Sequence, residues 1–312
     1  MATSNSIDFK STAQELIHDS AAIVKVIAPG ETLSGSNYAT CERILNRQLK
    51  AYQAKGLNLF TKTEVVIFQG SGSQSYDLSA SGDHACNASE LIETEIGADE
   101  ASGQTVITVD STTGMAASDY IGIEQDDDTI HWTTIVSVDD ATTVTISSAT
   151  TAASTTDNNV YTYTTRLNRP MDIVSARYKN DSGNETKLNK VAREQYFTQN
   201  VKSSNGQPNI FYYDPQLNAG KLYVWPVITN LNGYITATAI RTVEDIDSSA
   251  DNFDFPAEWE LAISLNLAVL IGRVLGRSEE SIALEQMARD ELVDAMMWDN
   301  EHTSLHLIPR RD

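Results

Sequence analysis

The segment CERILNRQLKAYQAKGLNLFTKTE, residues 41–64, passes from a helix to a strand, and the expected fold depends on this change. Its apolar residues recur at spacings of three and four, which predicts a helix with one apolar stripe: Cys41, Ile44, Leu45, Leu49 and Tyr52. Gly56 tolerates the positive φ with which many helices end. A β-branched strand is expected directly afterwards, over residues 64–69. The segment therefore predicts a helical part that leads straight into a sheet.

Helical periodicity appears near both ends of the chain. Residues 11–28 place apolar residues on one face, and the second helix is expected to begin after an N-cap at Ser36. Toward the C-terminus, a third helix is expected with Pro256 in its first turn, and a fourth over residues 278–298. From residue 261 to 271 the third helix is apolar on nearly every side, which predicts that it is buried all round.

Residues 88–165 differ from the rest of the chain in charge and composition. They carry −14 of the net charge of −21 and contain no Lys, Arg or Pro. Runs rich in Thr and other β-branched residues alternate there with turn residues, which is typical of strands. Beyond this acidic segment, residues 209–213 and 221–225 predict a hairpin, and residues 234–241 a further strand. The acidic segment is therefore expected to fold as an all-β module of its own.

The order of these segments predicts an α+β fold class. We expect the N- and C-terminal helix pairs to form a four-helix bundle, with a central β region and an inserted all-β module that is sandwich or barrel-like. Residues 1–87 and 166–312 would then make up the body of the protein, and residues 88–165 the insertion. Residues 299–312 are expected to form a C-terminal docking tail.

Composition and charge argue against several classes of protein. No run approaches the roughly 18 apolar residues of a membrane span, and the first residues lack the pattern of a secretory signal. Cys41 and Cys86 show no spacing that would indicate a disulfide framework or a zinc site. The net charge of −21 argues against a surface that wraps nucleic acid, because phosphates are bound by clustered Lys and Arg.

The sequence contains no recognisable catalytic or cofactor motif. It has no HExxH, P-loop, GxSxG or dinucleotide-binding pattern, and residues 126–128 lack the spacing and the distal Glu of a calcium loop. Pairs of carboxylates, such as Glu258 and Glu260, are expected by chance in a chain with 43 acidic residues. We therefore expect no enzyme activity, no metal and no cofactor.

The C-terminal residues are the strongest candidate for a non-catalytic binding segment. Apolar and polar residues alternate loosely there, and a proline and two arginines follow: Leu305, Leu307, Ile308, Pro309, Arg310 and Arg311. A frayed terminus is one interpretation. The other is an arm that docks into a groove of a partner protein or adds to the edge of its sheet.

Four segments occur in a characteristic order. They are GETLSGSNYATCERILNRQLKAYQAKGLNLFT (30–61), LNRPMDIVSARY (167–178), QPNIFYYDPQLNAGKLYVWP (207–226) and FPAEWELAISLNLAVLIGRVLG (255–276). Together they resemble the head-to-tail adaptor proteins of tailed bacteriophages, which are portal-binding connectors of the tubular tail protein A or packaged-DNA stabilisation protein type. The acidic segment departs from the family pattern, so the resemblance implies no role for it.

The resemblance implies a structural virion protein without catalysis. Such a protein forms a ring, usually of twelve copies, in the neck of the virion, where it joins the portal protein to a tail nozzle or tube protein. Double-stranded DNA would pass through the ring, and acidic walls would let it slide because like charges repel. The protein would be made in the cytoplasm of the bacterial host and would contact no membrane. The third helix would contact the bundle and neighbouring copies through Trp259, Leu261, Leu265, Ala268 and Ile271.

Two other functions compete with the adaptor ring. The acidic segment would act as a binding module for a tail fibre or a host-surface glycan if exposed aromatic residues converge on one face, and the candidates are Tyr120, Trp132 and Tyr161. A cell-wall hydrolase would instead need a cleft with two carboxyl groups about 5–10 Å apart, one of them with a raised pKa.

Overall fold

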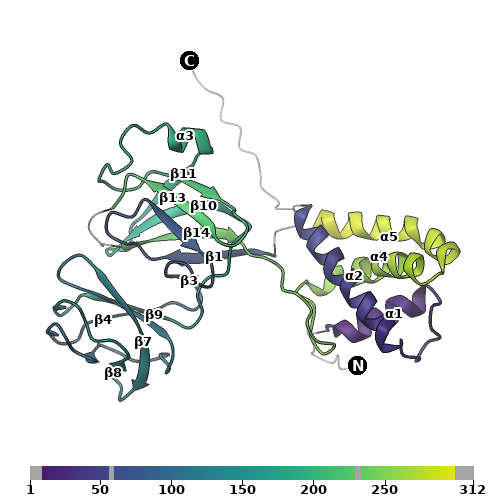
Figure 1. Ribbon diagram of the computed structural model, residues 1–312, viewed down its shortest axis with the longest axis horizontal. Coiled ribbons are helices and arrows are strands. Elements are labelled where there is room, and N and C mark those ends of the chain that lie inside the picture. Colours follow the sequence, from purple (N-terminus) through teal and green to yellow (C-terminus); the bar gives the residue numbers. More distant parts are fainter. Residues whose placement is uncertain (1–8, 56–59, 229–232, 299–312) are drawn as a thin grey trace, which may run out of the picture. The chain divides into compact units, whose positions relative to one another are not determined.

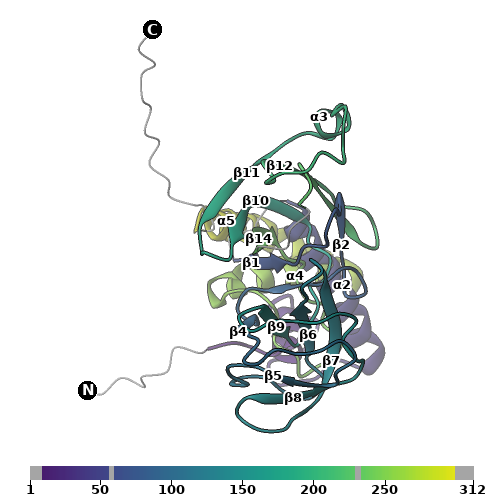
Figure 2. The ribbon, with the colours of Figure 1, turned by 90° about the vertical axis from the view of Figure 1, so that its left-hand side faces the viewer.

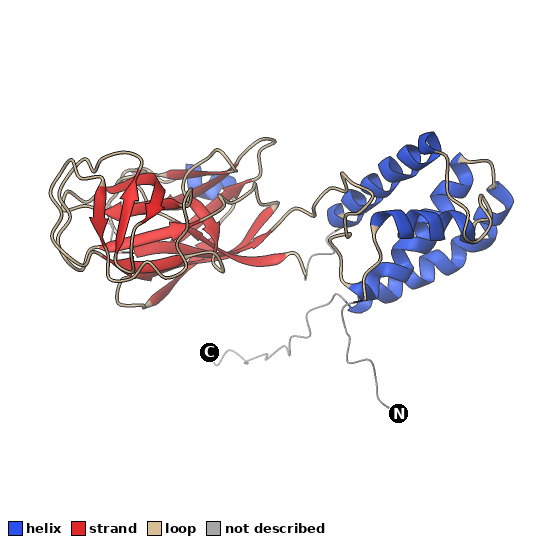
Figure 3. Ribbon diagram, turned by 90° about the horizontal axis from the view of Figure 1, so that it is seen from below, coloured by secondary structure: helices blue, strands red, loops and turns tan. Residues whose placement is uncertain are grey.

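The chain folds into two compact units (Figure 1). A computed structural model describes residues 9–55, 60–228 and 233–298 of the 312. Met1–Thr61 and Val243–Asp312 belong to one unit, the helical unit, and Lys62–Thr242 form the other, the β unit. Colouring by secondary structure shows that, apart from one short helix, the helices and the strands are segregated into these two units (Figure 3).

The expected α+β fold class, a four-helix bundle with an inserted β module, is wrong. The described residues are mostly β and form two curled sheets, of eight and six strands, together with five α-helices. One reason is that the strands outside the acidic segment are not a small central region but build the larger of the two sheets. The other reason is that the acidic segment forms a second sheet of six strands, so strands outnumber helices in the described residues.

The helical unit is built around a central helix, α4 (Glu260–Val274), which follows a short 3₁₀ turn, η1 (Ala257–Trp259). The other helices of the unit are α1 (Ala13–Ile23), α2 (Gly35–Ala54) and α5 (Ser278–Trp298). Helices α1, α2 and α5 all pack against α4, and α1 also contacts α2, whereas α5 packs mainly along α4. This arrangement explains the apolar sequence of α4, because its own chain covers it on several sides.

Two of the expected helix starts are wrong by a few residues. Helix α2 has its N-cap at Ser34 rather than at Ser36, and the Ser34 side chain makes no capping hydrogen bond with the backbone. Pro256 has an extended backbone and precedes η1 as its N-cap, so it is not the first helical residue. Helix α1 has a complete capping box, in which the side chains of Thr12 and Glu15 each bond the backbone of the other residue.

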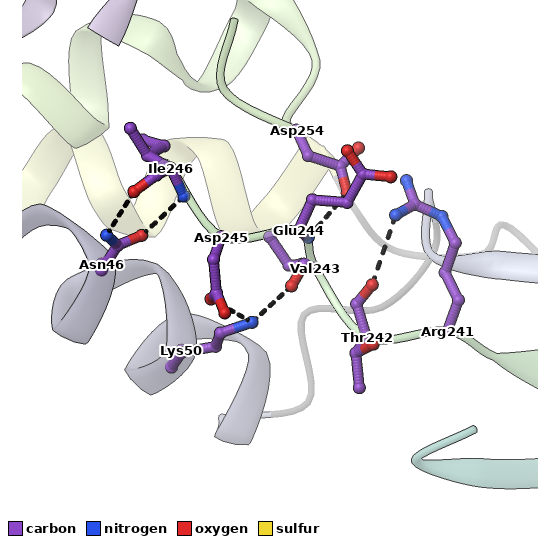
Figure 4. A network of polar contacts seen from close by, with 9 residues as sticks. All are labelled: Asn46, Lys50, Arg241, Thr242, Val243, Glu244, Asp245, Ile246 and Asp254. Atoms are coloured by element: carbon purple, nitrogen blue, oxygen red, sulfur yellow. Dashed lines mark hydrogen bonds and ion pairs between the residues drawn. The ribbon is translucent and has the colours of Figure 1, made fainter. Parts of the chain in front are cut away.

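The segment that follows the last strand is fixed to α2 by polar contacts (Figure 4). The Asn46 side chain donates to the carbonyl of Ile246 and accepts from its N–H, both at 2.9 Å. Lys50 Nζ lies 2.8 Å from the Asp245 carboxylate and also donates to the carbonyl of Val243. These contacts tie the returning chain to the helical unit directly after it leaves the β unit.

The larger sheet of the β unit has the strand order β2-β13-β12-β11-β10-β14-β1-β3. Its strands are β1 (Lys62–Ile67), β2 (Ser75–Leu78), β3 (Ala85–Asn87), β10 (Asp172–Asn180), β11 (Glu185–Lys190), β12 (Ile210–Asp214), β13 (Gly220–Trp225) and β14 (Gly233–Ile240). A flat sheet of this size would measure about 34 Å from edge to edge. The edge strands β2 and β3 are joined by residues 79–84 alone, which reach about 24 Å at most, so the sheet has to curl.

The smaller sheet takes all six strands from the acidic segment, in the order β4-β9-β6-β7-β8-β5 (Figure 2). They are β4 (Ile92–Glu95), β5 (Val106–Thr108), β6 (Tyr120–Glu124), β7 (Ile130–Val138), β8 (Thr143–Ile146) and β9 (Asn159–Tyr163). The two edges meet at a bridge between Ile96 and Val109, where Gly97 N donates to Thr108 O and Asp110 N donates to Glu95 O, each at 3.0 Å. The sheet therefore closes around an aliphatic core.

Candidate assembly surface

Helix α4 contributes most of its apolar surface to the core of its own chain. Trp259, Leu265, Ala268 and Ile271 are buried in the helical unit, whereas Leu261 is 53% exposed. Of the five residues expected to contact the bundle or a neighbouring copy, the structure leaves only Leu261 largely free to contact another protein. The apolar periodicity of residues 261–271 is thus explained mainly by packing within the chain.

Helix α5 presents large apolar side chains to solvent and small ones to α4. Ser281, Ala288 and Ala295 are buried, and Ser281 Oγ donates to Val269 O of α4 at 2.8 Å. Ile282 is 67% exposed and Val293 46% exposed. These two residues are eleven positions apart, close to three full helical turns, so they lie on one outward line that we call the α5 stripe, with Gln286 and Arg289 between them.

The tight contact between α4 and α5 explains why small residues face inward. A Cβ on Gly272 of α4 would lie 3.1 Å from Ser281 Cβ and 2.5 Å from a methyl of Val24. The amide of Asn266 also bridges the helices, since Nδ2 donates to Ala262 O at 2.8 Å and to Ala288 O at 2.7 Å. Three larger residues of α5, Leu284, Leu292 and Met296, also pack against the core and are partly covered.

A groove of about 260 Å³ lies in the helical unit between α2, α4 and α5. Its apolar lining includes Ala51, Val269 and Leu292, and its charged lining residues are Lys55, Arg273, Glu285 and Arg289. Glu285 pairs with Arg273 at 2.7 Å and with Arg289. The hydrogen bond from Arg289, together with the charge of Arg273, lowers the pKa of Glu285. The groove therefore combines apolar residues with predominantly basic charged residues on an acidic chain.

One buried polar atom of the groove has no partner. Gln48 is 6% exposed, and its Nε2 donates to Tyr52 Oη at 2.8 Å and to Ile263 O at 3.1 Å. Its Oε1 accepts no hydrogen bond from the described residues. A buried acceptor of this kind is usually satisfied, so Gln48 Oε1 is an exception within the core of the helical unit. Neither this groove nor the α5 stripe is evident from the sequence, because apolar residues occur on both sides of α5.

The structure brings Tyr120, Trp132 and Tyr161 together, but inside the β unit rather than on a free face. They belong to an aromatic cluster between the two sheets, centred on Phe68 at the end of β1. The Phe68 ring centroid lies 4.9 Å from that of Trp132 and 5.0 Å from that of Tyr161. The rings that a sugar would stack on are thus used to hold the two sheets together.

His84 completes this aromatic interface. Its ring stacks on Trp132 at 3.9 Å, Arg166 Nη2 donates to its Nε2 at 2.9 Å, and its Nδ1 bonds the Tyr163 hydroxyl at 2.6 Å. Burial, with the charge of Arg166, lowers the pKa of His84 to about 3, so the ring is neutral at physiological pH. Because Nε2 accepts from the arginine, Nδ1 carries the proton. This histidine is a structural group and has no arrangement for catalysis.

Both cysteines are buried in the core. Burial raises the pKa of Cys41 to about 11 and that of Cys86 to about 12, so neither thiol ionises near neutral pH. Among the described residues, no three His, Cys, Asp or Glu side chains are placed to hold a metal ion. None of the described helices is long and apolar enough to cross a bilayer. The expected docking residues lie outside the described residues: Leu305, Leu307, Ile308, Pro309, Arg310 and Arg311.

Comparison with known protein families and with curated proteins gives no match for this chain.

Proposed function

We propose that this chain is a structural virion protein, the adaptor ring that joins the portal vertex of a tailed bacteriophage to its tail and lines the DNA exit channel. The observation that carries this proposal is the α5 stripe. Helix α5 buries small residues in its own unit and exposes Ile282 and Val293, and these exposed apolar side chains could contact another protein. The resemblance of four segments, in the same order, to the adaptor family supports the choice of this assembly.

The helical unit carries two surfaces of the kind that a ring requires. A ring is closed by heterologous contacts, in which one patch of each copy binds a different patch of the next. The α5 stripe presents two outward apolar side chains, Ile282 and Val293, and the groove between α2, α4 and α5 is a recess partly lined by apolar residues. In the proposed ring, the α5 stripe of one copy packs against the groove of its neighbour.

The charge of the chain fits passage of DNA without adhesion. Each copy carries a net charge of −21, and DNA presents about one phosphate per 1.7 Å of its axis, so the two repel each other. The proposed partners are the portal protein, a tail nozzle or tube protein, further copies of this chain and passing double-stranded DNA. The docking tail, residues 299–312, would contact the portal.

The test is assembly of the full chain with its portal protein, followed by negative-stain imaging and mass photometry. We expect rings on the portal for the wild type. The double substitution Ile282→Glu, Val293→Glu should abolish them, because charges would replace the apolar contact. Val201→Glu is the matched control, since Val201 is an exposed apolar residue of the β unit. Absence of rings with the wild type, or rings with the double variant, would overturn the proposal.

A further inference from the structure

The β unit contains a cavity of about 490 Å³ that the proposed assembly does not use. One wall comes from the smaller sheet, with Glu93, Glu95 and Tyr161. The opposite wall comes from the larger sheet, with Asp181 in the turn between β10 and β11 and Tyr234 in β14. Asp110, Asn159, Lys179 and Asn180 complete the polar lining. We call this site the acidic cavity.

Most of the negative charge in the acidic cavity is uncompensated. Among the described residues, four carboxylates line it and Lys179 is the one basic residue of the lining. Lys179 Nζ lies 3.6 Å from Glu93, so that carboxylate is paired. Glu95, Asp110 and Asp181 have no ion-pair partner among the residues that the structure describes. Partial desolvation raises the pKa of Asp181, as expected for a carboxyl group without a cation beside it.

The second observation is a buried tyrosine without a hydrogen bond. Tyr161 is only 4% exposed and lines the acidic cavity, yet its hydroxyl bonds none of the described side chains or backbone groups. The hydroxyl is not one of the fully buried side-chain atoms without a partner, so it is open to the cavity. Its ring lies perpendicular to that of Tyr234, with the centroids 6.0 Å apart. The rings are therefore part of the packed aromatic cluster, and the cavity offers the Tyr161 hydroxyl beside the unpaired carboxylates.

Lys179 shows which chemistry this lining accommodates. Its ammonium group lies 4.9 Å from the centroid of the Tyr234 ring and donates to the Tyr234 hydroxyl at 2.6 Å. An alkylammonium group on a tyrosine, next to a carboxylate, is thus already present on one side of the cavity. The Tyr161 side has the same kinds of group but no cation from the described part of the chain.

The dispersed carboxylates favour an organic cation over a metal ion. A divalent ion needs several oxygen ligands at about 2.0–2.6 Å. No group of three or more His, Cys, Asp or Glu side chains is so placed in the described ranges, and the carboxylates surround a hollow of about 490 Å³. A hollow of this size fits an extended organic group, whose positive charge can contact several carboxylates and whose N–H groups can donate to the Tyr161 hydroxyl.

We propose that the acidic cavity binds an organic cation, an alkylammonium or guanidinium group, between Tyr161 and the carboxylates of Glu95, Asp110 and Asp181. The cation belongs either to a free polyamine or to a Lys or Arg side chain of a partner protein. The proposal does not depend on the adaptor ring, because every lining residue lies in the β unit and binding needs no second copy.

Calorimetric titration of the full chain tests the proposal. The ligands are spermidine, N-acetylargininamide, calcium chloride and glucose. The buffer contains about 0.1 M salt, which screens long-range electrostatic attraction. Saturable binding of spermidine, of N-acetylargininamide or of both is expected. Spermidine alone would indicate a free polyamine, and N-acetylargininamide alone a protein side chain. Binding of calcium or glucose without either organic cation would overturn the proposal, and so would no binding at all.

The variants Glu95→Gln and Asp181→Asn should each weaken cation binding about tenfold, and Tyr161→Phe by a smaller factor. The two carboxylates are exposed, so their replacement should leave the fold intact, which circular dichroism checks. Glu194→Gln is the matched control, because it removes one exposed carboxylate of the β unit outside the cavity. Equal weakening by Glu194→Gln would show attraction to the overall charge and would overturn the proposal.

Discussion

At the scale of single residues, the interface between the two sheets depends on His84 remaining neutral. The ring fits between Trp132 and Arg166, and protonation would place a second positive charge beside the arginine. The folded pKa of about 3 lies below the usual value of about 6.5, so the unfolded chain takes up a proton first as the pH falls. The stability that neutral His84 provides is complete above pH 6.5 or so and is lost between there and about pH 3.

This linkage predicts a pH-dependent loss of stability that His84→Gln should remove in part. The wild type should lose up to about 1.4 kcal/mol per pH unit through His84 between about pH 6 and 4. Glutamine does not titrate, so the variant should be less stable at pH 7 but show a flatter profile. Urea unfolding followed by tryptophan fluorescence measures both, and equal slopes for the two proteins would contradict the prediction.

Gly220 is a second residue that depends on one neighbour, because that neighbour leaves no space for a side chain. A Cβ at this position would lie 1.9 Å from the Tyr213 hydroxyl, which donates to Pro170 O at 2.5 Å. In the sequence, Gly220 indicates only the end of a hairpin loop. The structure places it at the start of β13, directly against a buried tyrosine from the paired strand, and such cross-strand contacts are not encoded in local periodicity.

Gly220→Ala should therefore destabilise the chain by about 1–3 kcal/mol through overpacking. In the double variant with Tyr213→Ala, the hydroxyl and the ring carbons that would lie 2.5 and 2.7 Å from the new Cβ are all absent, so the added methyl group should cost less. A double-mutant cycle from urea unfolding measures this coupling. Strict additivity of the two substitutions would show that the close contact with the Tyr213 side chain is not the cause.

At the scale of elements, helix α1 has the most complete local signal in the chain. The Thr12 side chain accepts from the Glu15 N–H at 3.3 Å, and the Glu15 carboxylate accepts from the Thr12 N–H at 2.8 Å. Both partners lie within one turn, which is why a capping box can be recognised in a sequence.

Thr12→Ala should cost about 1 kcal/mol of unfolding free energy, because the first turn of α1 loses its cap. Thr12→Ser keeps the hydroxyl and is the control that should stay near the wild type. Urea unfolding followed by far-ultraviolet circular dichroism compares the three proteins. A loss with Ser as large as with Ala would point to the methyl group of Thr12 rather than the cap.

The sequence predicts single elements better than their pairing. The helices, the hairpin of β12 and β13, and the β character of the acidic segment follow from local spacing and composition. Long-range pairing does not, since β2 and β3 are close in sequence but form opposite edges of one sheet, and β11 runs parallel to β12. Apolar residues on α4 and α5 look alike in the sequence, yet most of those on α4 are buried while Ile282 and Val293 are exposed.

At the scale of the whole molecule, the β unit begins and ends on neighbouring strands. Lys62 at the start of β1 pairs with Ile240 at the end of β14. The helical unit is discontinuous in sequence, because the chain leaves it at residue 61 to form the β unit and returns at residue 243. Sequence periodicity could not place these boundaries, because the composition changes at residues 88 and 165 instead, where only the smaller sheet begins and ends.

A fragment of residues 62–242 should consequently fold on its own. Its ends are already side by side in the sheet, and both sheet cores and the aromatic cluster lie inside it. Nuclear magnetic resonance should give dispersed amide signals, and urea should unfold the fragment cooperatively. A fragment of residues 88–165 is the comparison, since it lacks Phe68 and leaves its aromatic residues uncovered. A disordered 62–242 fragment would show that the helical unit is needed for folding.

The paired ends of the β unit also determine how it would respond to mechanical load. Tension applied at residues 62 and 240 would open the ladder between β1 and β14 like a zipper, one pair of hydrogen bonds after another, because both ends leave the sheet at the same place. The flanking segments are joined by the packing of α1 and α2 on α4 and by the contacts of Asn46 and Lys50. Under tension at the chain ends, the contacts within the helical unit would therefore have to break before force acts on the β1–β14 ladder.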